Sequence, residues 1–398
     1  MVNPFAALGV EPIVNACGTM TRLSGGPMPP EVAAAMAAAA QASVDIAALQ
    51  DAAGARLAAL SGAEAGMVTA GAAAGLMLGA AACIAGLDLA AMGTLPRCGR
   101  RPNEILMARS QRNFYDHALR QAGGRIVEVG LPDRYSGAGT RDAEAWEFAG
   151  AIGERTAAIL HVANRDAEPD LAVLAGVAAA HGIPLLVDAA ASLPPVGNLS
   201  GFIAAGADLV AFSGGKLIGG PQASGILVGR RRLIQSALLQ QLDHDIGFAQ
   251  WTPPPILGDA GLAALPQHGV GRVAKVGKEQ IVGLMTAVEL FLAEDPAERW
   301  RAWHASCVTM AEGLKGLPGM QVAIRGRIED ETPPVVVVDF AARTPAEVGA
   351  LIKRLQDGRP SVRVNPAERR QARILLAPAC LRPGEEATVA GRLRQECG

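Results

Sequence analysis

Lys216 stands between two glycine pairs in the stretch DLVAFSGGKLIGGPQASGILVGR, residues 208–230. The apolar runs before and after it indicate buried strands, so the amine is expected at a strand end. Burial disfavours the charged form of lysine, which lowers its pKa and makes the amine nucleophilic. The flanking glycines would let a planar ligand approach the backbone. On spacing alone, an exposed loop lysine in a glycine-rich turn explains this stretch equally well.

Asp188 ends an earlier apolar run, IPLLVDA, residues 183–189. Ligands of open α/β sheets bind beyond the carboxyl ends of the strands, so an acid at this point is well placed. A carboxylate against a pyridinium nitrogen would keep that nitrogen protonated and make the ring an electron sink. Taken alone, Asp188 fits the role of a helix N-cap equally well.

Thr69, Ala70, Gly71 and Ala72 join the expected strand GMVTA (66–70) to an alanine-rich helix. The free N–H groups at such a helix N-terminus can bind a phosphate, although an ordinary strand–helix junction would look the same. The hydroxyl of Ser213 could add a donor to that phosphate.

A phosphate cradle, a carboxylate after a strand and a downstream lysine are together typical of a site for pyridoxal 5'-phosphate (PLP). Their order and spacing along the chain make the joint pattern more specific than any one part. We therefore expect PLP as the cofactor and an imine between PLP and Lys216.

The composition of the chain speaks against several classes of protein. The 398 residues are 50% hydrophobic and 19% charged, which is enough for more than one domain. A formal net charge of -2 speaks against a nucleic-acid or anionic-membrane partner. The six cysteines form no CxxC pair, so neither a disulfide framework nor a metal site is expected. The N-terminus does not have the pattern of a signal peptide, and the run 70–86 favours a buried helix, so a cytoplasmic location is expected.

Apolar β-branched runs alternate with helical patterns through most of the chain. This alternation predicts an α/β fold with a mostly parallel sheet. We expect a large domain over residues 1–285, including an N-terminal arm over 1–30, and a smaller α+β domain over 286–398. The Pro- and Gly-rich segment 243–276 has no periodicity and is read as a specificity loop, a lid or a surface excursion. The expected strands of the large domain are 66–70, 104–109, 124–130, 157–163, 183–189, 208–213 and 224–229.

The chain resembles fold-type I PLP-dependent enzymes, and within them the selenocysteine-synthase-like group that includes D-glucosaminate-6-phosphate ammonia-lyase and L-seryl-tRNA selenium transferase. The resemblance makes Lys216 the Schiff-base lysine and Asp188 the partner of the pyridine nitrogen. It makes Thr69–Ala72 and Ser213 the phosphate cradle, and it implies a homodimer. The motifs that carry it are IVNACGTMTRLSGGPM (13–28), GAEAGMVTAGAAAGL (62–76), RNFYDHALRQAGGRIVEVG (112–130), VDAAASLPP (187–195), residues 208–230 and GRVAKVGKEQIVGL (271–284).

The other residue roles are open. Gln111, Arg112, Asn113 or Tyr115 could cover one face of the PLP ring, although Tyr115 is as well explained by helix packing. Arg373, in ARILLAP, stands where related folds hold the substrate carboxylate, but a solvated strand arginine is the alternative. Three further cations lie close together in the sequence: Arg272, Lys275 and Lys278. They could bind an anionic substrate, reach a neighbouring active site, or form the exposed start of a helix.

The resemblance implies an ammonia-lyase acting on a β-hydroxy α-amino acid such as an amino sugar acid. Lys216 would remove the α-proton, the β-hydroxyl would leave, and a 2-oxo acid and ammonia would form. A racemase or epimerase is the main alternative. Selenium transfer on seryl-tRNA is a weaker one, because the balanced charge offers no basic surface for RNA. A non-catalytic PLP-binding protein is a third, although the intact lysine and aspartate speak against it.

Overall fold

The computed structural model describes residues 4–131, 142–164, 167 and 169–397. The chain forms two compact units. The larger comprises Pro30–Val288, and the smaller combines Met1–Pro29 with Glu289–Gly398.

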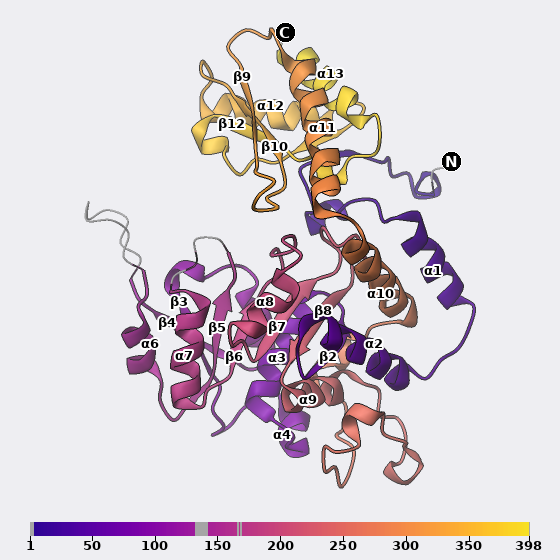
Figure 1. Ribbon diagram of the computed structural model, residues 1–398, viewed down its shortest axis with the longest axis vertical. Coiled ribbons are helices and arrows are strands. Elements are labelled where there is room, and N and C mark those ends of the chain that lie inside the picture. Colours follow the sequence, from indigo (N-terminus) through magenta and orange to yellow (C-terminus); the bar gives the residue numbers. More distant parts are fainter. Residues whose placement is uncertain (1–3, 132–141, 165–166, 168, 398) are drawn as a thin grey trace. The chain divides into compact units, whose positions relative to one another are not determined.

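The larger unit is built on a seven-stranded sheet with the order β2-β8-β7-β6-β5-β3-β4 (Figure 1). All neighbours are parallel except β8, which runs antiparallel to both β2 and β7. The mostly parallel sheet is therefore confirmed, and the seven expected strands form it with ends shifted by at most two residues. The strands are β2 (Ala65–Thr69), β3 (Glu104–Ala108), β4 (Arg125–Val129), β5 (Thr156–Val162), β6 (Leu185–Asp188), β7 (Leu209–Ser213) and β8 (Gly225–Gly229).

Helices cover both faces of this sheet. Side chains alternate between the faces along each strand, so neighbouring residues enter different cores. Leu186 packs in the core that contains α3, while Leu185 packs in the core that contains α6 and α7. The helices of this unit are α1 (Pro30–Ala40), α2 (Ile46–Ser61), α3 (Ala72–Ala85), α4 (Leu89–Thr94), α5 (Asp116–Gln121), α6 (Ala145–Ala151), α7 (Leu171–His181), α8 (Asn198–Ala204) and α9 (Arg231–Gln241), and α10 (Lys278–Ala293) begins in it.

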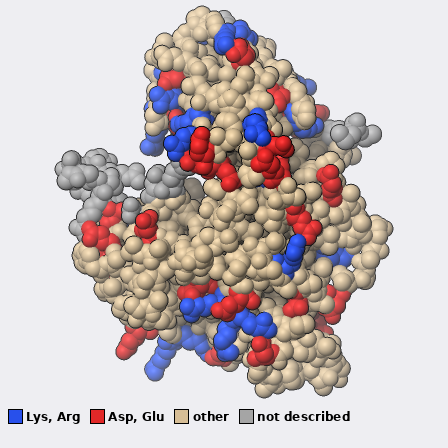
Figure 2. All heavy atoms as spheres, viewed as in Figure 1, with Lys and Arg blue, Asp and Glu red and all other residues tan. Residues whose placement is uncertain are grey.

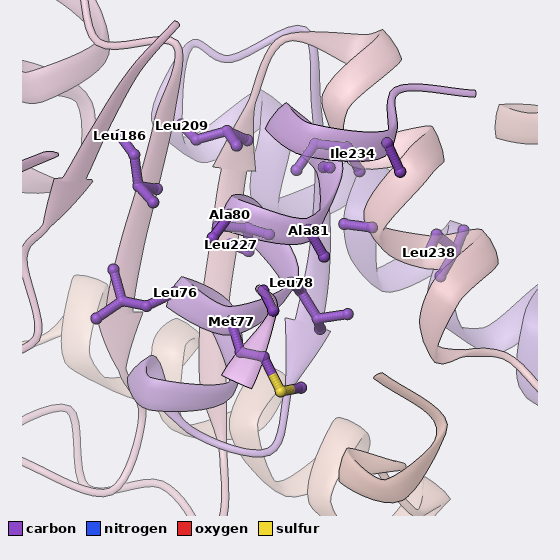
Figure 3. Close-up of a cluster of buried hydrophobic side chains, with 14 of the residues drawn as sticks. Leu76, Met77, Leu78, Ala80, Ala81, Leu186, Leu209, Leu227, Ile234 and Leu238 are labelled. Atoms are coloured by element: carbon purple, nitrogen blue, oxygen red, sulfur yellow. The ribbon is translucent and has the colours of Figure 1, made fainter. Parts of the chain in front are cut away.

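Helix α3 is the centre of the larger core. Figure 3 shows its side chains between strand residues such as Leu186 and Leu209 on one side and Ile234 and Leu238 of α9 on the other. The helix is rich in alanine and glycine because it lies close to the sheet; a Cβ on Gly79 would come within 3.1 Å of Leu186. The alanine-rich run is thus a buried helix, as expected. Among the described residues no helix is long and apolar enough to cross a membrane.

The smaller unit contains a three-stranded antiparallel sheet, β12-β10-β9, and a parallel pair, β1 with β11. The N-terminal arm, expected with the large domain, groups here with the C-terminal residues. The reason is that β1 pairs with β11 and buries Val14 and Ala16 in the same core as Met310 and Phe340. The elements are β1 (Val14–Ala16), α11 (Pro296–Leu314), β9 (Gln321–Arg325), β10 (Val335–Asp339), α12 (Pro345–Asp357), β11 (Val362–Val364), β12 (Arg373–Leu376) and α13 (Glu385–Cys397).

The aperiodic segment 243–276 is partly packed. It contains three short 3-10 helices, and Ile256 and Leu257 within it are buried in the α3 core. At its start the buried imidazole of His244 bonds through Nε2 to the carbonyl of Leu239 at 2.8 Å. Part of the segment therefore belongs to the fold of the larger unit.

On the face that Figure 2 shows, basic and acidic side chains lie among one another.

Candidate active site

The carboxyl edge of the sheet brings the candidate residues of the larger unit together. Thr69 ends β2 and Ser213 ends β7, and both pair in register with Gly225, the first residue of β8. Asp188 ends β6 and pairs with Ala211 of β7. Because alternate residues of a strand share a face, the side chains of Thr69, Ser213 and Asp188 all point to the face that carries α3.

The N-terminus of α3 lies at this edge and has no side-chain cap. Its N-cap is Gly71, whose φ of 125° is a conformation that favours glycine. A Cβ on Gly71 would meet no atom within 4 Å, so there is open space beside the helix end. The hydroxyl of Thr69 donates to the Gly71 carbonyl at 2.9 Å and fixes the turn. Free N–H groups with room in front of them suit a phosphate group.

Gly225 makes this arrangement possible. A Cβ there would lie 2.5 Å from the Gly71 carbonyl carbon, 2.8 Å from the Ala72 nitrogen and 2.8 Å from the Thr69 hydroxyl. The strand β8 therefore supports the turn before α3 by direct backbone contact. This glycine stands in the predicted motif, but its role depends on a strand pairing that the sequence does not reveal.

Asp188 and Lys216 are both buried enough for their charges to be disfavoured. Burial raises the pKa of Asp188, while the N–H of Ala190, at 3.1 Å, and the Lys216 charge oppose that rise. Burial lowers the pKa of Lys216, and the charge of Asp188 opposes that fall. The two groups thus act on each other electrostatically, and burial has the larger effect on each. A lysine in this state has more free amine at neutral pH than an exposed one.

The turn that carries Lys216 is held by backbone contacts. The N–H of Gly214 donates to Ser224 at 2.9 Å, and the N–H of Gly219 donates to the Lys216 carbonyl at 3.0 Å. A Cβ on Gly215 would lie 2.6 Å from the Gln222 backbone. Close packing within the turn therefore accounts for a glycine at position 215.

The segment between β3 and α5 contributes Gln111 to this edge. Its side chain is buried and accepts a hydrogen bond from the N–H of Val162 at 2.8 Å. Val162 pairs in register with Asp188, so Gln111 lies beside the strand that carries the acid. Tyr115 is 56% exposed, as expected if it has no packing role within this unit. Of the ring-face candidates, Gln111 is the one that the structure ties to Asp188.

Asp116 was not recognised from the sequence as a site residue. It is buried at the start of α5, pairs with Arg112 and accepts from the N–H of Asn113 at 3.3 Å. Its charge contributes to raising the pKa of Asp188, so it is close enough to affect that acid. Arg112 also pairs with Glu128, which leaves its guanidinium engaged by two carboxylates. An acid at a helix start is common, and nothing in the local sequence separates this one.

Arg272 and Lys275 lie beside a cavity of about 210 Å³ in the larger unit. Arg272 Nε donates to Asp243 at 3.0 Å, whereas Lys275 is exposed. The third cation of this set, Lys278, pairs with Glu279 at 3.0 Å.

A chain of buried amides connects the Arg272–Lys275 segment to the strand before the phosphate turn. Gln50 bonds to both backbone polar groups of Val68 and donates to Gln241 at 3.0 Å. Gln241 in turn donates to the carbonyl of Ala274 at 3.3 Å.

Arg373 lies in the smaller unit, at the start of β12. Its Nε donates to Asp339 at 2.6 Å, and its Nη1 is 3.9 Å from Glu368. Two carboxylates therefore already balance the charge of this arginine. The same unit holds a larger cavity that Arg22 and Arg363 line, and neither residue was singled out from the sequence.

The chain is similar in sequence to known proteins over most of its length. The family model described as L-seryl-tRNA selenium transferase matches residues 43–246. The 5'-C-glycyluridine monooxygenase-decarboxylase of a Streptomyces species is 30% identical and covers 98% of this chain and 91% of its own. The D-glucosaminate-6-phosphate ammonia lyase of Salmonella typhimurium is 30% identical and covers 99% and 97%.

Solved structures show which fold the chain has. The structure of D-glucosaminate-6-phosphate ammonia-lyase matches with a TM-score of 0.79 and 29% identity over 100% of this chain and 99% of that one. DesI, solved with its TDP-sugar product, matches with a TM-score of 0.55 and 19% identity over 99% and 96%, which bears on the fold alone. The expected fold, type I of the PLP-dependent enzymes, is confirmed.

Proposed function

Because the chain belongs to the L-seryl-tRNA selenium transferase family, we propose that it is a PLP-dependent ammonia-lyase. The proposed substrate is a β-hydroxy α-amino acid of the amino sugar acid class, and the products are a 2-oxo acid and ammonia. The observation that carries the proposal is the pair Lys216 and Asp188. Asp188 is buried and Lys216 half-buried, each charge affects the other group's pKa, and both residues share one sheet edge with the uncapped N-terminus of α3.

The residues at this edge fit PLP. The backbone N–H groups at the start of α3, from Gly71 onward, would hold the phosphate, and the hydroxyls of Thr69 and Ser213 lie on the same face. Asp188, as a carboxylate, would hold the proton on the ring nitrogen. Gln111 is the candidate for the ring face. When bound, PLP supplies an electron sink that stabilises negative charge at the substrate α-carbon.

Lys216 would first hold the coenzyme through Nζ and then act as a base. Burial lowers its pKa, so more of the amine is unprotonated than in an exposed lysine, and both roles use the unprotonated amine. With substrate bound, the free Nζ would take the proton from the α-carbon and could return it to the β-hydroxyl, which would leave as water. Hydrolysis of the product would then release ammonia. Asp188 would stay ionised if a protonated ring nitrogen lay beside it, because the opposite charge favours the carboxylate.

The relatives do not share one reaction. One is named an ammonia lyase and another a monooxygenase-decarboxylase, at the same identity. A fold does not select the reaction, so the branch has to be measured. An ammonia-lyase needs no co-substrate other than water, whereas a monooxygenase consumes O₂. A racemase would invert the α-carbon and release no ammonia.

The test is a panel of D- and L-β-hydroxy amino acids and amino sugar acids, with and without phosphate, incubated with the PLP-loaded protein. Ammonia, 2-oxo acid, O₂ uptake and enantiomer ratio are followed in each reaction. We expect equal amounts of ammonia and 2-oxo acid, no O₂ uptake and no inversion. Lys216→Ala should abolish the reaction, and Lys353→Ala, on the exposed face of α12, should leave it unchanged. Inversion without ammonia, or O₂-dependent release of CO₂, would refute the proposal.

We also propose that the protein is at least a homodimer with a small-molecule substrate and no nucleic-acid partner. The exposed Lys275 would then be available to a neighbouring copy. Light scattering of the purified protein gives the mass directly, and a monomer at micromolar concentration would contradict this part.

A further inference from the structure

The smaller unit contains a cavity of about 520 Å³ that none of the roles above uses. Its walls come from the N-terminal arm, from β11 and from the segment that leads into α13. This volume lies within the range of about 300–1,000 Å³ that is usual for small-molecule sites. It is therefore large enough for a small organic acid.

Asn15 builds one wall of this cavity. Its Nδ2 donates to the carbonyls of Gly18, at 3.1 Å, and Gly25, at 2.9 Å, and its Oδ1 accepts from the N–H of Cys17 at 3.0 Å. These three bonds tie the glycine-rich loop to β1. Gly26 packs against Cys380, because a Cβ there would lie 3.2 Å from the sulfur. The wall is thus formed by a loop that is fixed at both ends.

The charged lining consists of three arginines and two glutamates: Arg22, Arg363, Arg382, Glu11 and Glu385. Arg363 lies on β11 directly opposite Asn15, and its Nε is buried without a hydrogen-bond partner. Arg22 makes one weak contact, from Nη2 to the Cys17 sulfur at 3.8 Å. Across the described ranges, neither arginine forms an ion pair with a carboxylate. Arg382, in contrast, is held by Glu385 through Nε at 2.8 Å.

A guanidinium with buried, unpaired N–H groups is costly unless an acceptor reaches it. Its planar fork matches the oxygens of a carboxylate or phosphate. Neither lining carboxylate is that acceptor: Glu385 is bonded to Arg382, Glu11 is exposed, and the buried Nε of Arg363 has no partner.

We propose that this cavity binds a small molecule through a carboxylate or phosphate group, with Arg363 and Arg22 as the two anion-binding side chains. The site goes beyond the proposed reaction, since it lies within the smaller unit and requires neither Lys216 nor PLP. The carboxylate-paired Arg373 is the rival for the same role, and the two arginines can be separated by substitution.

Isothermal titration calorimetry of the full-length protein tests the proposal. The probes are acetate, inorganic phosphate and gluconate 6-phosphate, at constant ionic strength. Gluconate 6-phosphate has no amine, so it cannot react in place of an amino acid substrate. Binding of phosphate or acetate alone identifies a free anion as the ligand, and binding of gluconate 6-phosphate alone identifies an organic acid. Either result supports the site only if Arg363→Gln and Arg22→Gln each weaken the binding of that probe.

The expected effect of either substitution is a loss of about tenfold or more in affinity, as for a lost hydrogen bond to a charged group. Arg327→Gln is the matched control, because Arg327 is exposed in the same unit and pairs with Asp330. The control should bind as the unaltered protein does. No binding of any probe, equal affinity in Arg363→Gln, or loss in Arg373→Gln alone would overturn the proposal. Since no PLP is needed, these outcomes are independent of the ammonia-release test.

Discussion

Gly225→Ala is predicted to weaken PLP binding without touching Lys216 or Asp188. The new Cβ would lie 2.5 Å from the carbonyl carbon of Gly71 and 2.8 Å from the nitrogen of Ala72. Both atoms belong to the backbone of the phosphate turn, so no side-chain rotation can relieve the overlap. Overpacking of this kind costs about 1–3 kcal/mol. If that cost falls on the phosphate-binding conformation, the Kd for PLP rises roughly 5- to 150-fold.

The assay is a PLP titration followed by absorbance, together with the Tm of the coenzyme-free protein. Gly201→Ala is the control, because a Cβ at this helical glycine would meet no atom within 4 Å. The control should bind PLP normally and be slightly more stable, since alanine is the better helix former. If Gly225→Ala lowers Tm but leaves the Kd unchanged, the turn before α3 does not hold the phosphate, and the reasoning is wrong.

Three further predictions follow from buried polar groups. Gln50→Leu should lower the free energy of unfolding by about 2–5 kcal/mol in urea titrations, because the Gln50 side chain makes three buried hydrogen bonds. The control, Gln121→Leu, changes an exposed glutamine and should have little effect. Burial lowers the pKa of His161 to about 4, so between pH 6.5 and pH 4 the unfolded chain binds a proton that the folded chain does not. The free energy of unfolding should therefore fall over this range. His161→Leu should flatten the fall in urea titrations at several pH values, whereas His181→Leu, at an exposed histidine, should not. The rate of PLP attachment to Lys216 should rise with pH and level off below the ordinary lysine pKa, because burial lowers the pKa of Lys216. A midpoint of the pH profile at the ordinary lysine pKa would contradict the burial argument.

Much of the larger unit could be predicted from the sequence because its strands are apolar runs that end in recognisable residues. Thr69, Asp188 and Ser213 follow such runs, and parallel strands place their carboxyl ends at one edge of a sheet. The structure places these three residues at one edge of the sheet, as this reasoning predicts. It did not show that β8 runs antiparallel between β2 and β7, because apolar runs look alike in both directions.

The features missed from the sequence depend on contacts between distant segments. Arg363 becomes notable only because β1 pairs with β11 and brings Asn15 opposite it. Arg373 was chosen by position in related folds, yet Asp339 lies across the ladder and pairs with it. Both outcomes depend on strand register, which local patterns do not specify in short strands.

Borohydride reduction of the PLP-loaded protein, followed by peptide mass spectrometry, tests the central claim most directly. Reduction fixes the coenzyme to the amine that holds it. We predict a single modified peptide with the added mass on Lys216, and no fixed coenzyme in Lys216→Ala. A protein that stays colourless with PLP, or one that carries the added mass on another lysine, would contradict the account.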